Sequence, residues 1–97
     1  MIHLDTRVCL ARHARLRDDP RTGKPILLAP ERGLELNPTG ARIARLCGEE
    51  RPVADIVERL VGESDGSAGR AQIEVEVLAF LRALEERGLL VARQTPS

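Results

Sequence analysis

Residue types that commonly carry out chemistry are few in this sequence, and they are dispersed. The two histidines are His3 and His13, and neither has a Cys, Asp or Glu at a spacing typical of zinc sites. Cys9 and Cys47 form no Cys-x-x-Cys pair. Cys47 falls on the apolar face of a predicted helix, which indicates a buried structural thiol. We therefore expect no metal site.

The acidic pairs Glu49-Glu50 and Glu85-Glu86 are adjacent in sequence. Adjacent side chains point in different directions and cannot share a proton as a catalytic pair of carboxylates does. There is no glycine-rich phosphate loop after a predicted strand and no nucleophile elbow. The sequence predicts a protein that is not an enzyme and that needs no cofactor.

The chain has 97 residues, with 15 Lys plus Arg against 15 Asp plus Glu. This length predicts one domain, over residues 1–92, followed by a disordered tail at 93–97. Phe80 is the one aromatic residue, and without a basic excess or a stacking platform we expect no nucleic-acid partner. No apolar run is long enough for a membrane span or a signal peptide. We therefore expect a cytoplasmic protein with reduced thiols.

The first half of the chain predicts a three-stranded antiparallel meander that leads into a helix. Strands are expected at 13–18, 25–29 and 33–36, because short apolar or alternating runs are separated by Pro- and Gly-containing turns. Asn37-Pro38 is typical of a helix start, so a helix is expected over 38–47 with Gly48 as a left-handed cap.

Two further helices are predicted in the second half. The first begins at Pro52 and runs over 52–61; a flexible polar loop follows at 62–69. The last helix ends near Gly88 and carries a core stripe made of Ile73, Val77, Phe80, Leu81 and Leu84. Residues 1–12 and 89–92 are expected to form short strands or simply to pack onto the domain. The pattern predicts an α+β, winged-helix-like fold.

Three features could bind a partner or could be purely structural. The short third strand, Leu34-Glu35-Leu36, is expected at a sheet edge, where another chain can add a strand. The last helix has a second, partly apolar stripe nearly opposite its core stripe, and this second stripe is either a groove wall or a contact with another helix or subunit. Its residues are Ala71, Val75, Leu78 and Arg82. Four arginines against one aspartate give the first seventeen residues a net charge of +3, either on a solvated face or in a docking patch for an acidic partner.

A DNA-binding winged helix is an alternative with the same order of elements. The second and third helices are each net negative by one charge, and a helix that enters the major groove is rarely acidic. Salt-dependent binding to duplex DNA would distinguish this alternative.

The chain resembles the pyrroloquinoline quinone biosynthesis protein D (PqqD) family. The matching segments are Leu-Leu-Ala-Pro-Glu-Arg at 27–32, Leu-Cys-Gly at 46–48, Val-Ala-Asp-Ile-Val at 53–57 and the segment 76–90. The resemblance covers roughly residues 8–91. It departs at Lys24-Pro25, where many members have an aromatic residue, and at Pro52, where many have Ser or Thr.

The resemblance implies a peptide chaperone that binds the precursor peptide PqqA and presents it to the radical S-adenosylmethionine enzyme PqqE. In related recognition domains the leader peptide adds as a strand beside the third strand and lies against the third helix. At the matching positions of this chain, the resemblance implies a peptide-binding site. Its residues are Gly33, Leu34, Glu35, Leu36, Ala71, Val75, Leu78 and Arg82. The leader of another ribosomal peptide pathway is an alternative ligand. The expected state is a monomer or a weak homodimer, because an unpaired edge can pair with itself.

Overall fold

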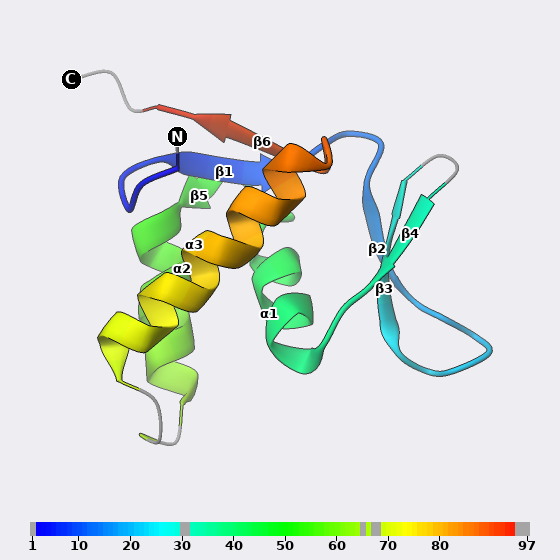
Figure 1. Ribbon diagram of the computed structural model, residues 1–97, viewed down its shortest axis with the longest axis horizontal. Coiled ribbons are helices and arrows are strands. Elements are labelled where there is room, and N and C mark those ends of the chain that lie inside the picture. Colours follow the sequence, from blue (N-terminus) through cyan, green and yellow to red (C-terminus); the bar gives the residue numbers. More distant parts are fainter. Residues whose placement is uncertain (1, 30–31, 65, 67–68, 95–97) are drawn as a thin grey trace.

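The computed structural model describes residues 2–29, 32–64, 66 and 69–94, which contain six strands and three helices in an α+β fold. The strands form two separate antiparallel sheets, ordered β2-β3-β4 and β5-β1-β6. Figure 1 shows the first sheet standing beside the three helices and the second lying across one end of them.

The predicted meander is confirmed as the sheet of β2 (Arg15–Asp18), β3 (Pro25–Ala29) and β4 (Arg32–Glu35), which we call the wing sheet. The turn between β2 and β3 is closed by the amide of Gly23, which donates to the Asp19 carbonyl at 2.7 Å. Gly23 has a φ of 72°, a left-handed conformation that favours glycine. The turn between β2 and β3 is therefore specified by local chemistry.

Helix α1 (Pro38–Leu46) follows directly after the wing sheet. Its start is as predicted, because the Asn37 side-chain oxygen accepts a 2.7 Å hydrogen bond from the Gly40 amide. Its end differs, since Gly48 is not among the residues with positive φ and Cys47 closes the helix in a right-handed conformation. A side chain replaces the expected glycine cap: Arg51 Nε donates to the Leu46 carbonyl at 2.7 Å.

Helix α2 (Val53–Glu63) begins one residue after Pro52, which lies in the short strand β5 (Arg51–Pro52). Its first amides are satisfied by the N-terminal segment: those of Val53 and Ala54 donate to carbonyls of that segment at 2.9 and 2.8 Å. Hydrogen bonds from Arg51 and Arg59 hold the pKa of Asp55, in the first turn of α2, below its usual value. Arg51 thus links the end of α1 to the start of α2.

The second sheet was only weakly indicated by the sequence. Strand β1 (Arg7–Leu10) lies between β5 and β6 (Leu90–Arg93), and it is antiparallel to both. Gly88, with a φ of 73°, reverses the chain after the last helix and sends β6 back along β1. Arg93, expected at the start of the tail, is the last residue of β6, whereas residues 95–97 lie outside the described residues.

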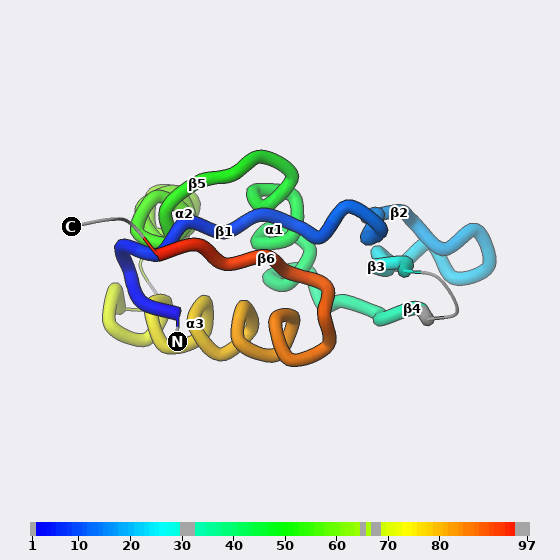
Figure 2. The backbone as a smooth tube through the Cα atoms, turned by 90° about the horizontal axis from the view of Figure 1, so that it is seen from above, coloured from blue at the N-terminus to red at the C-terminus, as the bar shows by residue number. Residues whose placement is uncertain are grey.

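Helix α3 (Arg70–Glu86) is the longest element and is confirmed as a core helix. Figure 2 shows it along one side of the molecule, with β4 near its C-terminal end. Part of the loop expected at 62–69 lies outside the described residues, and α2 itself extends to Glu63. Within the described ranges, no helix is long and apolar enough to cross a membrane, and no three His, Cys, Asp or Glu side chains gather as a metal site.

The two cysteine thiols differ in how deeply they are buried. Cys47 is fully buried, and desolvation raises its pKa to about 12, whereas Cys9 is half-buried. Because the thiolate is the reactive form, we predict that a thiol reagent at pH 8 labels one cysteine in the folded protein and the second only after unfolding. Mass spectrometry of the labelled chain checks this. The variant Cys9→Ser is the control and should leave the folded protein unlabelled; rapid labelling of that variant would contradict the prediction.

Candidate functional site

Strand β4 is an edge of the wing sheet, and its hydrogen-bonding pattern decides which backbone groups face outward. The Leu36 amide donates to the Pro25 carbonyl at 2.9 Å, which fixes the phase of the ladder between β3 and β4. Alternate residues of an antiparallel pair exchange hydrogen bonds, so Leu34 also turns its N–H and C=O toward β3. Gly33 and Glu35 therefore turn theirs away from the sheet, where an added strand could pair with them.

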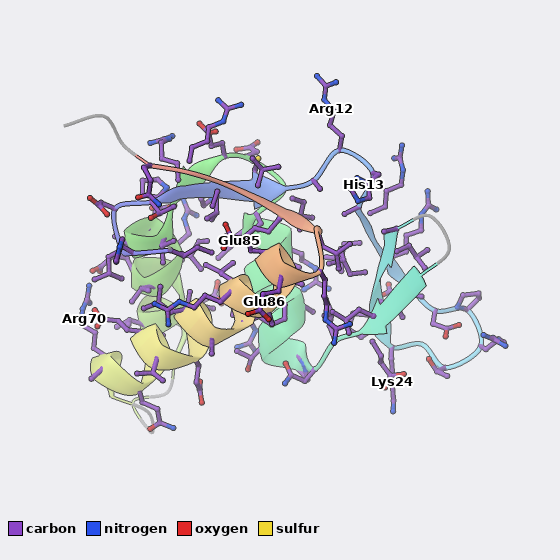
Figure 3. The ribbon with its side chains drawn as sticks, turned by 45° about the horizontal axis from the view of Figure 1, so that its top comes forward. Arg12, His13, Lys24, Arg70, Glu85 and Glu86 are labelled. Atoms are coloured by element: carbon purple, nitrogen blue, oxygen red, sulfur yellow. The ribbon has the colours of Figure 1, made fainter. Side chains whose placement is uncertain are left out.

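The side chains of residues 34–36 point alternately to the two faces of the wing sheet. Leu36 is 6% exposed and belongs to the core, and Leu34 packs against that core from a half-buried position. Glu35 is exposed on the opposite face, where its carboxylate lies 3.6 Å from Lys24 Nζ. Figure 3 shows Lys24 projecting from the wing sheet, away from α3. Of the four residues expected at the edge, Leu36 is thus buried, and its amide is already bonded.

A shallow groove runs along α3 and separates it from the end of β4 and the start of α1. Two adjoining hollows form it, with volumes of about 210 and 290 Å³. Both are smaller than the roughly 300–1,000 Å³ of typical small-molecule sites, so the groove suits side chains of an extended ligand better than an enclosed small molecule. Both hollows are lined by Asn37 and Phe80. The other lining residues from α3 and its C-terminal cap are Glu76, Ala79, Ala83, Leu84 and the cap residue Arg87.

Phe80 sits at the middle of this groove and at the margin of the core. Sequence periodicity placed it in the core stripe, and the structure finds it only half-buried, packed against the core from the groove side. Its ring faces Gly40 of α1 so closely that a Cβ on Gly40 would lie 2.9 Å from ring carbon Cε1. The missing side chain of Gly40 therefore allows α1 to approach α3, and the approach brings β4 beside Phe80.

The expected stripe on α3 lies on a different flank. Ala71, Val75, Leu78 and Arg82 are centred about 140° around the helix from the groove-lining residues, at 3.6 residues per turn. Arg82 donates to the Ile2 carbonyl at 3.2 Å, Leu78 packs on the core, and Val75 is 67% exposed. The structure therefore does not bring this stripe to β4. Part of the stripe covers the N-terminal segment instead.

The flank of α3 that faces β4 could be found only in part from the sequence. Phe80 is the one aromatic residue, and Ala79 and Ala83 beside it are small enough to leave room on one side of the helix. The side of α3 that faces β4 depends on how α1 packs, and this packing is set by the contact between Gly40 and Phe80. No helical periodicity within α3 contains that information.

Two charged side chains on the α3 side, one acidic and one basic, line the groove. Glu76 on α3 and Arg87, which caps the C-terminus of α3, are exposed, and neither has an ion-pair partner among the described residues. The groove therefore offers both a carboxylate and a guanidinium to a ligand with an apolar centre. Glu85 and Glu86, which lie at the end of α3 in Figure 3, belong instead to a hollow that Ile2 and Arg82 also line.

The sequence of this chain is similar to those of proteins from one known family. Residues 26–90 match the family model described as coenzyme PQQ synthesis protein D (PqqD). This match includes more than half of the chain. The chain belongs to the PqqD family. A relative from Rhodopseudomonas palustris strain TIE-1, named PqqA binding protein, is 38% identical over 91 residues, which cover 93% of this chain and 87% of the relative.

Solved structures agree with the family assignment. The solution NMR structure of the PqqD truncation of Methylobacterium extorquens PqqCD has a TM-score of 0.78 at 30% identity, with 94% of this chain and 95% of that chain covered. It represents a functional, stand-alone recognition element for ribosomally synthesized and post-translationally modified peptides. TbiB1 in complex with the TbiA(beta) leader peptide has a TM-score of 0.71 at 25% identity, with 84% of this chain and 93% of that chain covered.

The contact between Gly40 and Phe80 yields a prediction about stability. Ala is the better helix former, yet in Gly40→Ala the new methyl group would press on the Phe80 ring, so we expect a loss of about 1–2 kcal/mol in the free energy of unfolding. Gly62→Ala, also in a helix but with nothing within 4 Å, should gain about 0.5–1 kcal/mol. Denaturant unfolding measures both. Equal stabilisation by the two substitutions would contradict the close approach.

Proposed function

We propose that this chain binds the precursor peptide PqqA as a strand added along β4 and presents it to the radical S-adenosylmethionine enzyme PqqE in pyrroloquinoline quinone biosynthesis. The observation that carries the proposal is the outward direction of the Gly33 and Glu35 backbone groups beside the groove of Phe80. A peptide that paired with this edge would satisfy these groups and lay alternate side chains toward α3.

The family relationship supports the choice of peptide. Several relatives are named PqqA binding proteins, and a structural neighbour is a complex with a leader peptide. Backbone pairing along β4 would supply affinity that tolerates sequence differences. The half-buried Phe80, with Ala83 next to the groove and Arg87 at its end, would select an apolar side chain followed by an acidic one.

The proposed role assigns the chemistry to the enzyme and the binding to this chain. A two-residue outward edge offers at most four backbone hydrogen bonds, each of which contributes only about 0.5–1.5 kcal/mol net. Side-chain burial in the groove must therefore contribute a large part of the affinity. This division makes the groove flank of α3 the place where selectivity is decided.

The leader of another ribosomal peptide pathway is the second candidate ligand, because the match to TbiB1 concerns a different leader peptide. Parallel titrations with PqqA and an unrelated leader distinguish the two. Tighter binding of PqqA supports the first proposal, and tighter binding of the unrelated leader would replace it.

Two substitutions on α3 test which flank contacts the peptide. Ala83→Glu puts bulk and charge into the groove, so we expect PqqA binding to weaken at least tenfold, or about 1.4 kcal/mol. Val75→Glu makes a similar change at an exposed position that lines neither hollow and lies about 80° around the helix from Ala83, so it should alter the affinity less than twofold. Calorimetric titration measures both affinities. A larger loss in the Val75 variant would return the site to the stripe expected from the sequence.

A further inference from the structure

The outer face of the wing sheet, which points away from α1, carries a pattern of side chains that the core does not use, and of these residues Glu35 alone also lines the proposed groove. Strand alternation and register place Arg15, Leu28 and Gly33 in one row and Arg17, Ile26 and Glu35 in the next. In Figures 1 and 2 the wing sheet stands at one end of the molecule, with the helices on one side of it only. This six-residue surface is called the outer wing face.

The centre of the outer wing face is apolar and incompletely covered. Ile26 and Leu28 are half-buried and are absent from the side chains that form or pack against the core. Gly33 adds no side chain beside them, although a Cβ there would lie at 3.4 Å from Leu28 Cδ2 and 3.9 Å from Ile26 Cδ1. On its β4 side Leu28 thus has no side chain beside it, whereas Ile26 has Glu35.

The margin along β2 is positively charged. Arg15 and Arg17 are exposed, and within the described ranges neither has an ion-pair partner. By contrast, Lys24 lies 3.6 Å from Glu35, so the opposite margin is close to neutral. A protein that presents carboxylates around an apolar protrusion would match this surface in charge and in polarity.

The outer wing face is also continuous with the proposed peptide site. A strand added to β4 would place every second side chain on this same face, next to Gly33. A protein docked here would therefore contact the wing sheet and the bound peptide at once. That arrangement suits the protein that receives the peptide.

We propose that the outer wing face is the docking surface for the peptide-modifying enzyme, which binds it with an acidic surface around an apolar protrusion. This inference rests on the proposed function, because the enzyme used as the probe is PqqE. The peptide and the enzyme would meet at Gly33 and Glu35 on β4. Arg15 and Arg17 lie on β2, at the far side of the sheet, so substitutions there should spare peptide binding.

The test compares two pairs of charge reversals that change the net charge equally. Arg15→Glu with Arg17→Glu alters the outer wing face, and Arg42→Glu with Arg45→Glu alters exposed positions of α1. Affinities for purified PqqE and, separately, for PqqA are measured by calorimetric titration, after amide spectra confirm that each variant is folded. We expect the first pair to weaken PqqE binding at least tenfold and PqqA binding less than twofold, and the second pair to change PqqE binding less than threefold.

The outcomes separate this inference from the proposed function. Equal effects of the two pairs on PqqE binding would overturn the docking surface while the peptide role stands. Loss of PqqA binding in the first pair would assign the outer wing face to the peptide and also overturn the inference. Self-association that the first pair abolishes, measured by sedimentation, would make a second copy the occupant. Failure of the unmodified chain to bind PqqE would overturn both presentation and docking.

Discussion

The contact between Gly40 of α1 and the ring of Phe80 on α3 is the interaction on which the groove beside β4 depends. Strand β4 runs into α1 through Leu36 and Asn37, so the position of α1 fixes that of β4. Asn37 holds the start of α1 by accepting from the Gly40 amide, next to the same contact. A cap, a glycine and an aromatic ring together therefore set the width of the groove.

The two sheets have different parts in this arrangement. The sheet β5-β1-β6 ties the ends of the chain to α2, because the N-terminal segment accepts hydrogen bonds from the first amides of that helix. The wing sheet is built from local hairpins and leaves β4 at an edge. Long-range contacts thus hold the helices in place, while the locally specified sheet supplies the backbone groups for recognition.

The sequence predicted the elements with short-range signals and missed those that depend on distant partners. The wing strands, the Asn37 cap and α3 followed from turn residues and periodicity, and the resemblance identified the family. Strands β1 and β5 carry no alternating pattern of their own. They form by pairing with segments distant in sequence: β1 with β6, which returns after Gly88, and β5 with β1. The strand at Gly33 was predicted from the turn residues around it, and it lies at a sheet edge as expected. The flank of α3 beside it depends on how α1 packs, which is not a short-range signal.

The most direct test of the central claim, that a peptide adds as a strand along β4, is amide hydrogen exchange with and without saturating PqqA. Gly33 and Glu35 turn their amides outward, whereas the Leu34 amide already faces β3. The account predicts that exchange slows at least tenfold at Gly33 and Glu35, with little change at Leu34. Unchanged exchange at Gly33 and Glu35 in the saturated complex would contradict strand addition at this edge.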